Sequence, residues 1–83
     1  MPKIEIYTTA VCPYCDRAKQ LLKSKNAEYA EIRIDLDNTQ REEMMARSQR
    51  RSVPQIFIDN KHIGGFDDLY ALEQAGKLDQ LLK

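Results

Sequence analysis

The stretch Ile4-Glu5-Ile6-Tyr7-Thr8, followed after three residues by Cys12-Pro13-Tyr14-Cys15, decides the expected fold. The first segment alternates apolar and polar residues, which is typical of a half-buried strand. Pro13 suits the first turn of a helix, because the N–H group that proline lacks would have no helical partner there. Apolar residues then recur at helical spacing up to about Lys25. We therefore expect a strand that leads into a helix through a pair of cysteines.

The remaining chain predicts three more strands and two more helices. Strands are expected over 29–34, 54–58 and 62–63, and helices over 39–49 and 67–75. A last apolar helical turn carries Leu78, Leu81 and Leu82. The resulting order, β-α-β-α-β-β-α, predicts a right-handed parallel crossover first and a hairpin, with its turn at 59–61, later. An α/β fold with a four-stranded mixed sheet flanked by helices follows.

The start of the second predicted helix has more than one possible cap. Thr39 and Glu42 have the spacing of a capping box, and Asp37 or Asn38 could cap the helix instead.

The composition is that of one small globular domain over residues 1–83. Its 13 basic and 13 acidic residues cancel, which argues against nucleic acid or an anionic membrane as a partner. The basic stretch Arg47-Ser48-Gln49-Arg50-Arg51 is expected to be a solvated helix end. No segment has the pattern of a signal peptide or a membrane span, so we expect the protein to lie in the cytoplasm. We also expect it to be a monomer.

The cysteine pair is expected to be redox-active. Cys12 lies at a strand-to-helix junction, where unpaired N–H groups and the helix dipole favour a thiolate over a thiol. Cys15 lies about one turn further along the same face and should be more enclosed. We therefore expect Cys12 to attack a disulfide and Cys15 to resolve the mixed disulfide that forms.

Two other interpretations of the pair remain open. A structural zinc site needs four ligands, but His62 is the one histidine in the sequence and there is no second cysteine pair. No metal site is therefore expected within one chain. Two buried, unreactive cysteines fit poorly with Pro13 and Tyr14 between them. A Cys-x-x-Cys pair in a βαβ context favours redox chemistry.

Three motifs together resemble the dithiol glutaredoxins, and most closely the bacterial glutaredoxin 3 group. They are Cys12-Pro13-Tyr14-Cys15, Ser52-Val53-Pro54 before a strand, and Gly64-Gly65-Phe66-Asp67-Asp68 before a helix. The resemblance spans nearly the whole chain. It implies a thioredoxin-like fold, a cis peptide bond at Pro54, and glutathione as co-substrate with no tightly bound cofactor. It also implies disulfide-containing or glutathionylated proteins as partners.

The resemblance further implies a glutathione groove beside the cysteines. The backbone of Val53, next to Pro54, would pair with the ligand like an added strand. The N–H groups near Asp67 and Asp68 would bind the γ-glutamyl carboxylate, and an aspartate would hold the ammonium group. Of the two, Asp67 is expected to cap the helix and Asp68 to contact the ligand. Tyr14 would line the groove.

Several positions depart from the usual pattern of these relatives. Thr9 stands where a lysine for the glycine carboxylate is common. Arg41, on the second predicted helix, could compensate for that lysine, or it could be a plain exposed charge. Ser52 replaces the usual threonine, and Phe66 takes a position that is often cysteine.

The implied activity is that of a glutathione-dependent thiol–disulfide oxidoreductase. One alternative is a thioredoxin-like reductant served by thioredoxin reductase, against which the motif at 64–68 argues. Another is a dimer that bridges an iron–sulfur cluster. It is disfavoured because Pro13 follows Cys12 and because Cys15 competes by forming a disulfide.

Overall fold

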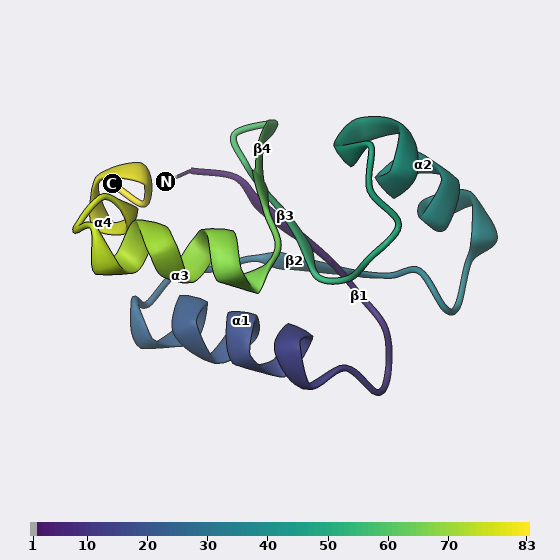
Figure 1. Cartoon of the computed structure of the whole chain (residues 1–83), viewed down its shortest axis with the longest axis horizontal. Helices are drawn as coiled ribbons and strands as arrows, with labels where there is room; N and C mark the ends of the chain where they lie inside the picture. Colours follow the sequence, from purple (N-terminus) through teal and green to yellow (C-terminus); the bar gives the residue numbers. More distant parts are fainter. Residues whose placement is uncertain (1) are drawn as a thin grey trace.

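A computed structural model describes residues 2–83 and shows eight elements in the predicted order, with the last turn forming a separate short helix (Figure 1). They are β1 (Ile4–Thr8), α1 (Pro13–Ser24), β2 (Ala30–Arg33), α2 (Asn38–Ser48), β3 (Gln55–Ile58), β4 (Lys61–Gly64), α3 (Phe66–Gln74) and α4 (Leu78–Leu81). Over the described residues, no helix has the length and apolar character that crossing a membrane requires.

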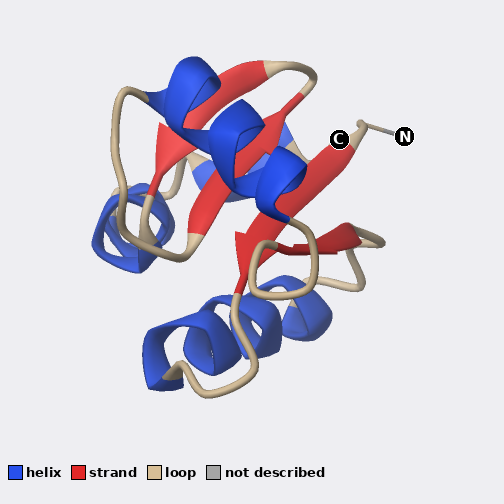
Figure 2. Ribbon diagram, turned by 90° about the vertical axis from the view of Figure 1, so that its right-hand side faces the viewer, coloured by secondary structure: helices blue, strands red, loops and turns tan. Residues whose placement is uncertain are grey.

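The four strands form one mixed sheet in the order β2-β1-β3-β4. β1 and β2 run parallel, with Tyr7 opposite Ile32, while β3 is antiparallel to both β1 and β4. Helices lie on both faces of this sheet (Figure 2). The predicted mixed sheet flanked by helices is confirmed.

Alternate residues of the central strands belong to two separate hydrophobic cores, because successive side chains of a strand point to opposite faces of the sheet. Ile4 and Ile6 pack with side chains of α1 and α3 on one face. Tyr7 packs on the other face, with Met44 of α2 and Phe57 of β3. The arrangement places the start of α1 and the start of α3 on the same side of the sheet.

The second helix begins one residue earlier than predicted, and Asp37 is its cap. The Asp37 carboxylate accepts a hydrogen bond from the backbone N–H of Thr39 at 2.9 Å. The Thr39–Glu42 capping box is therefore wrong, and the Asp37 alternative is confirmed. The extended backbone of Asp37 (φ −148°, ψ 112°) is the conformation that lets a side chain reach the first free N–H groups.

Arg47 is part of the packing and not a solvated helix end. Its guanidinium lies 3.9 Å from the ring centroid of Phe57, and it donates to the Tyr7 hydroxyl at 2.8 Å and to Glu5 at 3.1 Å. Burial is the main cause that raises the pKa of Tyr7. The prediction failed because Glu5 and Tyr7 belong to a strand some forty residues earlier in the chain.

Candidate active site

The two cysteines lie where β1 passes into α1. Cys12 is the N-cap of α1, and its sulfur accepts the backbone N–H of Cys15 at 3.1 Å. The two sulfur atoms are joined in a disulfide, with the Cα atoms 5.1 Å apart. Cys12 retains 9% of its surface exposed, whereas Cys15 is completely buried. An attacking thiol can therefore approach the sulfur of Cys12 more readily than that of Cys15.

The helix start also favours negative charge on the sulfur of Cys12. Because Cys12 is the N-cap, its sulfur faces free N–H groups at the positive end of the helix dipole. Hydrogen bonds from these N–H groups stabilise a thiolate more strongly than a thiol, so they favour the ionised form of Cys12. The geometry thus matches the expected division into a nucleophilic Cys12 and an enclosed Cys15.

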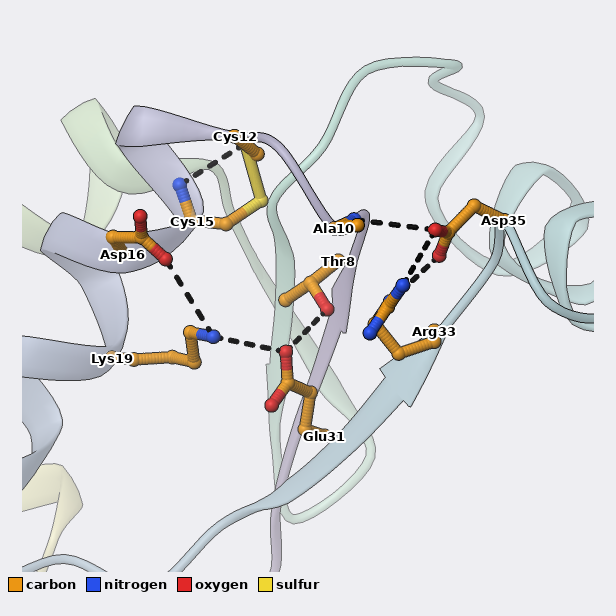
Figure 3. A network of polar contacts seen from close by, with 9 residues as sticks. All are labelled: Thr8, Ala10, Cys12, Cys15, Asp16, Lys19, Glu31, Arg33 and Asp35. Atoms are coloured by element: carbon orange, nitrogen blue, oxygen red, sulfur yellow. Dashed lines mark hydrogen bonds and ion pairs between the residues drawn. A yellow bond between two sulfur atoms is a disulfide. The ribbon is translucent and has the colours of Figure 1, made fainter.

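A polar network holds α1 against β1 and β2 (Figure 3). The Thr8 hydroxyl donates to a Glu31 oxygen at 2.7 Å, and Lys19 donates to the same oxygen at 3.0 Å. The hydrogen bond from Thr8 is the main cause that lowers the pKa of Glu31. Thr8 ends β1 and Lys19 lies one turn after Cys15, so the network fixes both sides of the cysteine loop.

A second contact holds the cysteine loop from the β2 side (Figure 3). The Asp35 carboxylate accepts the Ala10 backbone N–H at 3.3 Å and forms two hydrogen bonds of 2.7 Å with Arg33. The Arg33 guanidinium is the main cause that lowers the pKa of Asp35 to about 2. The loop between β1 and α1 is thus anchored to the residues that follow β2.

A shallow cavity of about 290 Å³ lies beside Tyr14 and the loop before β3. Seven of the eight residues predicted to bind glutathione line it, together with Arg50 and Gly65. The seven are Tyr14, Ser52, Val53, Pro54, Phe66, Asp67 and Asp68. The structure therefore brings three sequence motifs, which lie far apart along the chain, to one place.

The wall of the cavity nearest the cysteines is the Val53–Pro54 peptide. This bond is cis, as the resemblance implied. The sulfur of Cys12 lies 3.9 Å from the carbonyl oxygen of Val53, which places this backbone directly beside the redox centre. A Cβ atom at Gly65 would lie 3.4 Å from the Pro54 carbonyl oxygen, an ordinary van der Waals contact, so the start of α3 packs directly against this peptide.

The opposite wall is the start of α3, where Asp68 is held by two partners. Its carboxylate accepts the Gly65 backbone N–H at 2.9 Å and pairs with Arg50 at 3.1 Å. The Gly65 N–H is the main cause that lowers the pKa of Asp68, and Arg50 adds to the effect. Capping therefore belongs to Asp68 and not to Asp67, which is exposed. The expected cap Asp67 is therefore wrong, while the expected contact of Asp68 with the ligand stays a prediction.

Comparison with known protein families decides which family has this groove and cysteine pair. A sequence model of the family described as Glutaredoxin matches residues 4–63. The chain belongs to the glutaredoxin family. The family and the Cys12–Cys15 pair confirm the expected glutathione-dependent thiol–disulfide oxidoreductase.

Individual glutaredoxins are similar to this chain over its whole length. Glutaredoxin 3 of Escherichia coli (strain K12) is 59% identical over 83 residues, covering 100% of both chains. The solution structure of glutaredoxin from Brucella melitensis matches at 55% identity with a TM-score of 0.88, covering 100% of this chain and 90% of that one. The crystal structure of a buckwheat glutaredoxin–glutathione complex matches at 30% identity with a TM-score of 0.90, covering 98% and 76%.

One predicted binding residue of this glutaredoxin lies elsewhere. Arg41 is half-buried on α2 and is not among the residues that line the cavity within the described chain. Thr9 is half-buried in the loop before Cys12. The role of Arg41 at the glycine end of glutathione stays a prediction.

Two residues contribute to this glutaredoxin site without a signal for that role in their own stretch of sequence. Arg50 is the first: it is exposed, as expected for the basic stretch, and it also pairs with Asp68, with both residues lining the cavity. Asp35 is the second, and it holds the cysteine loop by accepting the Ala10 backbone N–H. The spacing Arg33-x-Asp35 at the end of a strand is a local signal for the ion pair, although the contact with Ala10 crosses between strands.

Besides the two cysteines, His62 is a residue near this glutaredoxin site whose side chain is of a type that binds metals. Its Nε2 lies 2.7 Å from the side-chain oxygen of Gln55, and burial lowers its pKa. Within residues 2–83, no three side chains of histidine, cysteine, aspartate or glutamate are grouped as a metal ion would require.

Proposed function

We propose that this glutaredoxin reduces protein disulfides and glutathione mixed disulfides, with Cys12 as the nucleophile and Cys15 as the resolving cysteine. The observation that carries the proposal is the position of Cys12. Its sulfur caps a helix start and lies beside the cis Val53–Pro54 peptide, which forms one wall of the cavity.

In the dithiol reaction, the Cys12 thiolate attacks a disulfide of the substrate protein. A bond forms between Cys12 and one substrate sulfur, and the other substrate sulfur leaves as a thiolate that takes up a proton. Cys15, deprotonated, then attacks the sulfur of Cys12 and releases the second substrate thiol. The resulting Cys12–Cys15 disulfide is the state of the structure. Two glutathione molecules reduce it and leave as glutathione disulfide.

In the monothiol reaction, the Cys12 thiolate attacks the glutathione sulfur of a glutathionylated protein. The glutathionyl group moves to Cys12, and the substrate cysteine leaves as a thiolate. A second glutathione thiolate then attacks the glutathione sulfur on Cys12. Glutathione disulfide forms and the Cys12 thiolate returns. Cys15 has no part in this reaction, so the two activities can be separated by substitution.

Glutathione is proposed to lie in the cavity with its thiol toward Cys12. The Val53 backbone pairs with the cysteinyl unit, and the N–H groups at Asp67 and Asp68 bind the γ-glutamyl carboxylate. The Asp68 carboxylate holds the α-ammonium group, for which it must share or exchange its contact with Arg50. The other predicted groove residues are Tyr14, Ser52, Pro54 and Phe66, with Arg41 at the glycine end.

The proposal treats residues 1–83 as one glutaredoxin domain that acts as a monomer with glutathione as co-substrate. A reducing compartment such as the cytoplasm is the proposed location, because the cycle ends with glutathione returning both cysteines to thiols. The physiological partners are proposed to be disulfide-containing or glutathionylated proteins.

A pair of coupled assays tests the proposal. With glutathione, glutathione reductase and NADPH, the protein should turn over the mixed disulfide of glutathione and β-mercaptoethanol. With thioredoxin reductase and NADPH in place of the glutathione system, turnover should be absent. The opposite pattern would identify a thioredoxin-like reductant. A visible absorption band with dimer formation after anaerobic iron–sulfur reconstitution, together with no turnover in either assay, would instead indicate a cluster carrier.

A further inference from the structure

A completely buried amide side chain supports one wall of the cavity from inside the protein. Gln55 follows Pro54 at the start of β3, and none of its surface is exposed. Its side-chain nitrogen donates to the Ser52 carbonyl oxygen at 3.0 Å and, over a longer 3.3 Å, to the Ser52 hydroxyl. Ser52, Val53 and Pro54 line the cavity, whereas Gln55 does not. Gln55 therefore contacts the groove backbone without taking part in its surface.

His62 determines which way the Gln55 amide is turned. The Ser52 carbonyl oxygen can only accept a hydrogen bond, so the amide nitrogen faces it and the amide oxygen faces the other way. The His62 Nε2 lies 2.7 Å from this amide oxygen, so Nε2 carries a hydrogen and donates it. Burial lowers the pKa of His62, which favours the neutral ring. The ring lies against Phe57, with the two ring centroids 5.0 Å apart.

The hydrogen bond from Gln55 fixes the plane of the Ser52–Val53 peptide. Among residues 2–83, the cis peptide bond is Val53–Pro54, so the Ser52–Val53 peptide is trans. The C=O and N–H groups of a planar trans peptide point in opposite directions. Because the Ser52 oxygen is bound to Gln55, the Val53 N–H must point away from Gln55.

The sheet shows which side that is. Gln55 pairs with Tyr7 in the sheet, and Tyr7 packs in the core that α2 covers. The cavity is lined by the starts of α1 and α3, which lie on the other face. The Val53 N–H is therefore directed toward the side on which glutathione is proposed to bind.

We propose that Gln55 is a positioning residue for glutathione binding. Its amide, oriented by His62, holds the Ser52–Val53 peptide so that the Val53 N–H is presented to the carbonyl group of the cysteinyl unit of glutathione. The hydrogen bond to the Ser52 oxygen also polarises the peptide, which makes its N–H a stronger donor. A thiol without a peptide group gains nothing from this N–H, so Gln55 sets a preference for glutathione over simple thiols. The inference rests on the proposed function and adds to it the residue that prepares the groove.

The test compares how strongly Cys12 takes up glutathione and β-mercaptoethanol. The parent protein is the Cys15→Ser variant, in which Cys12 is the remaining cysteine. In each reaction the Cys12 thiolate attacks one sulfur of a symmetric disulfide, either glutathione disulfide or the disulfide of β-mercaptoethanol. The S–S bond of the reagent breaks, and its second half leaves as a thiolate that takes up a proton. Mass spectrometry at a series of thiol-to-disulfide ratios gives two equilibrium constants, and we call their quotient the glutathione preference.

Two substitutions in this parent should lower the glutathione preference. Gln55→Met nearly keeps the length of the side chain and removes its hydrogen bonds, and the preference should fall about tenfold, the effect of about one hydrogen bond. His62→Phe keeps a ring beside Phe57 and removes the donor that orients the amide, so the preference should fall about threefold. In both variants the equilibrium with β-mercaptoethanol should change less than about twofold.

Ile58→Val is the matched control on the same strand. Ile58 is buried in the core on the opposite face from Gln55, and its substitution leaves the contacts of Ser52 in place. It should lower the thermal melting midpoint slightly and leave the glutathione preference unchanged. The melting midpoint is measured for every variant, so a loss of preference can be compared with the loss of stability.

Two outcomes for Gln55→Met would overturn the positioning role. One is an unchanged glutathione preference, and the other is an equal loss for both thiols, because a general disturbance around Cys12 would affect both adducts alike. If Gln55→Met does not fold, His62→Phe decides, and a preference equal to that of the parent would overturn the role. Failure of the proposed function looks different. The Cys15→Ser parent would then show no preference for glutathione at all, and the role of Gln55 would fall with it.

Discussion

The Gly64–Asp68 corner of the cavity and the loop before α1 are built in different ways. At the Gly64–Asp68 corner, Asp68 bonds to the Gly65 backbone and to Arg50, and the Asp68 carboxylate leaves no room for a Cβ atom on Gly64. The Thr9 loop (residues 9–12), where the glycine end of glutathione is proposed to bind, is held by the contact of Asp35 with Ala10. Thr9 places no charge there, and Arg41 does not reach the lining of the cavity.

The difference separates two kinds of recognition. The corner depends on backbone geometry and on contacts that constrain one another, so one substitution disturbs several interactions at once. The Thr9 loop would contribute to glutathione binding through side-chain charge alone, and a charge at half-buried Thr9 would remain partly solvated, so its effect should be modest. We therefore expect substitutions at the corner to be severe and substitutions in the Thr9 loop to adjust affinity.

The largest effect is expected from Gly64→Ala. Gly64 has a φ of +122°, and a Cβ atom there would collide with the Asp68 carboxylate. Both the backbone strain and the displacement of Asp68 should destabilise the fold, by about 3 kcal/mol, and impair glutathione turnover. Urea unfolding and the glutathione-coupled assay measure the two effects.

Gly76→Ala is the matched control for this substitution. Gly76 also has a positive φ, +71°, but a Cβ atom there meets nothing within 4 Å. Its cost should be about 1 kcal/mol, with the KM for glutathione unchanged. Equal costs for the two substitutions would mean that the contact with Asp68 adds nothing to the constraint at the corner.

The next largest effect is expected from Asp68→Asn. The amide oxygen can still accept the Gly65 N–H, but the negative charge proposed to hold the ammonium group of glutathione is gone. The KM for glutathione should rise about tenfold, because a charge-assisted hydrogen bond is replaced by a neutral one. Asp67→Asn, at the exposed neighbouring position, should change this KM by less than about twofold. Similar changes for both variants would contradict the proposed role of Asp68.

A smaller effect in the opposite direction is expected from Thr9→Lys. A cation at the Thr9 loop should attract the glycine carboxylate and lower the KM for glutathione about threefold, with the gain disappearing at high salt. Arg41→Gln, made in the same assay, should raise this KM if Arg41 fills the place of the lysine. An unchanged KM in both variants would show that the binding of glutathione does not depend on charge at Thr9 or Arg41.

The smallest effect concerns the titration of Asp68. The pKa of Asp68 is lowered in the folded protein, so the ionised carboxylate stabilises the fold. This stabilisation is fully present above the ordinary aspartate pKa of about 3.9, and it is lost as the pH falls through the lower pKa of the folded state. In a carbon-13 NMR titration, Arg50→Gln should raise the midpoint of Asp68 only part of the way, since the Gly65 N–H is the larger cause. A return to about 3.9 would show that Arg50 is the main cause instead.

Much of the fold could be predicted because its signals are local. Alternation in Ile4–Thr8, helical spacing after Pro13 and the glycine pair before α3 each specify one element from neighbouring residues. The order of the elements then leaves few possible sheets. The redox pair was equally visible, because the cysteines are three residues apart at a strand-to-helix junction.

The contacts that could not be predicted join distant parts of the chain. Arg47 and Arg50 stand in one basic stretch, yet the first packs against β1 and β3 and the second pairs with Asp68 of α3. Nothing within the stretch distinguishes these roles. The wrong choice of Asp67 over Asp68 as the cap has a local cause, since it depends on which residue starts the helix. That boundary is among the least certain features of any sequence-based prediction.

The most direct test of the central claim is a map of the glutathione adduct on single-cysteine variants. Cys15→Ser and Cys12→Ser are each incubated with glutathione disulfide, and the modified residue is identified by mass spectrometry over time. We predict one glutathione on Cys12 in the Cys15→Ser variant, which keeps its monothiol activity, and little or no modification of buried Cys15 in the Cys12→Ser variant. Equally fast modification of Cys15, or monothiol turnover at the wild-type rate by Cys12→Ser, would contradict the assignment of Cys12 as the nucleophile.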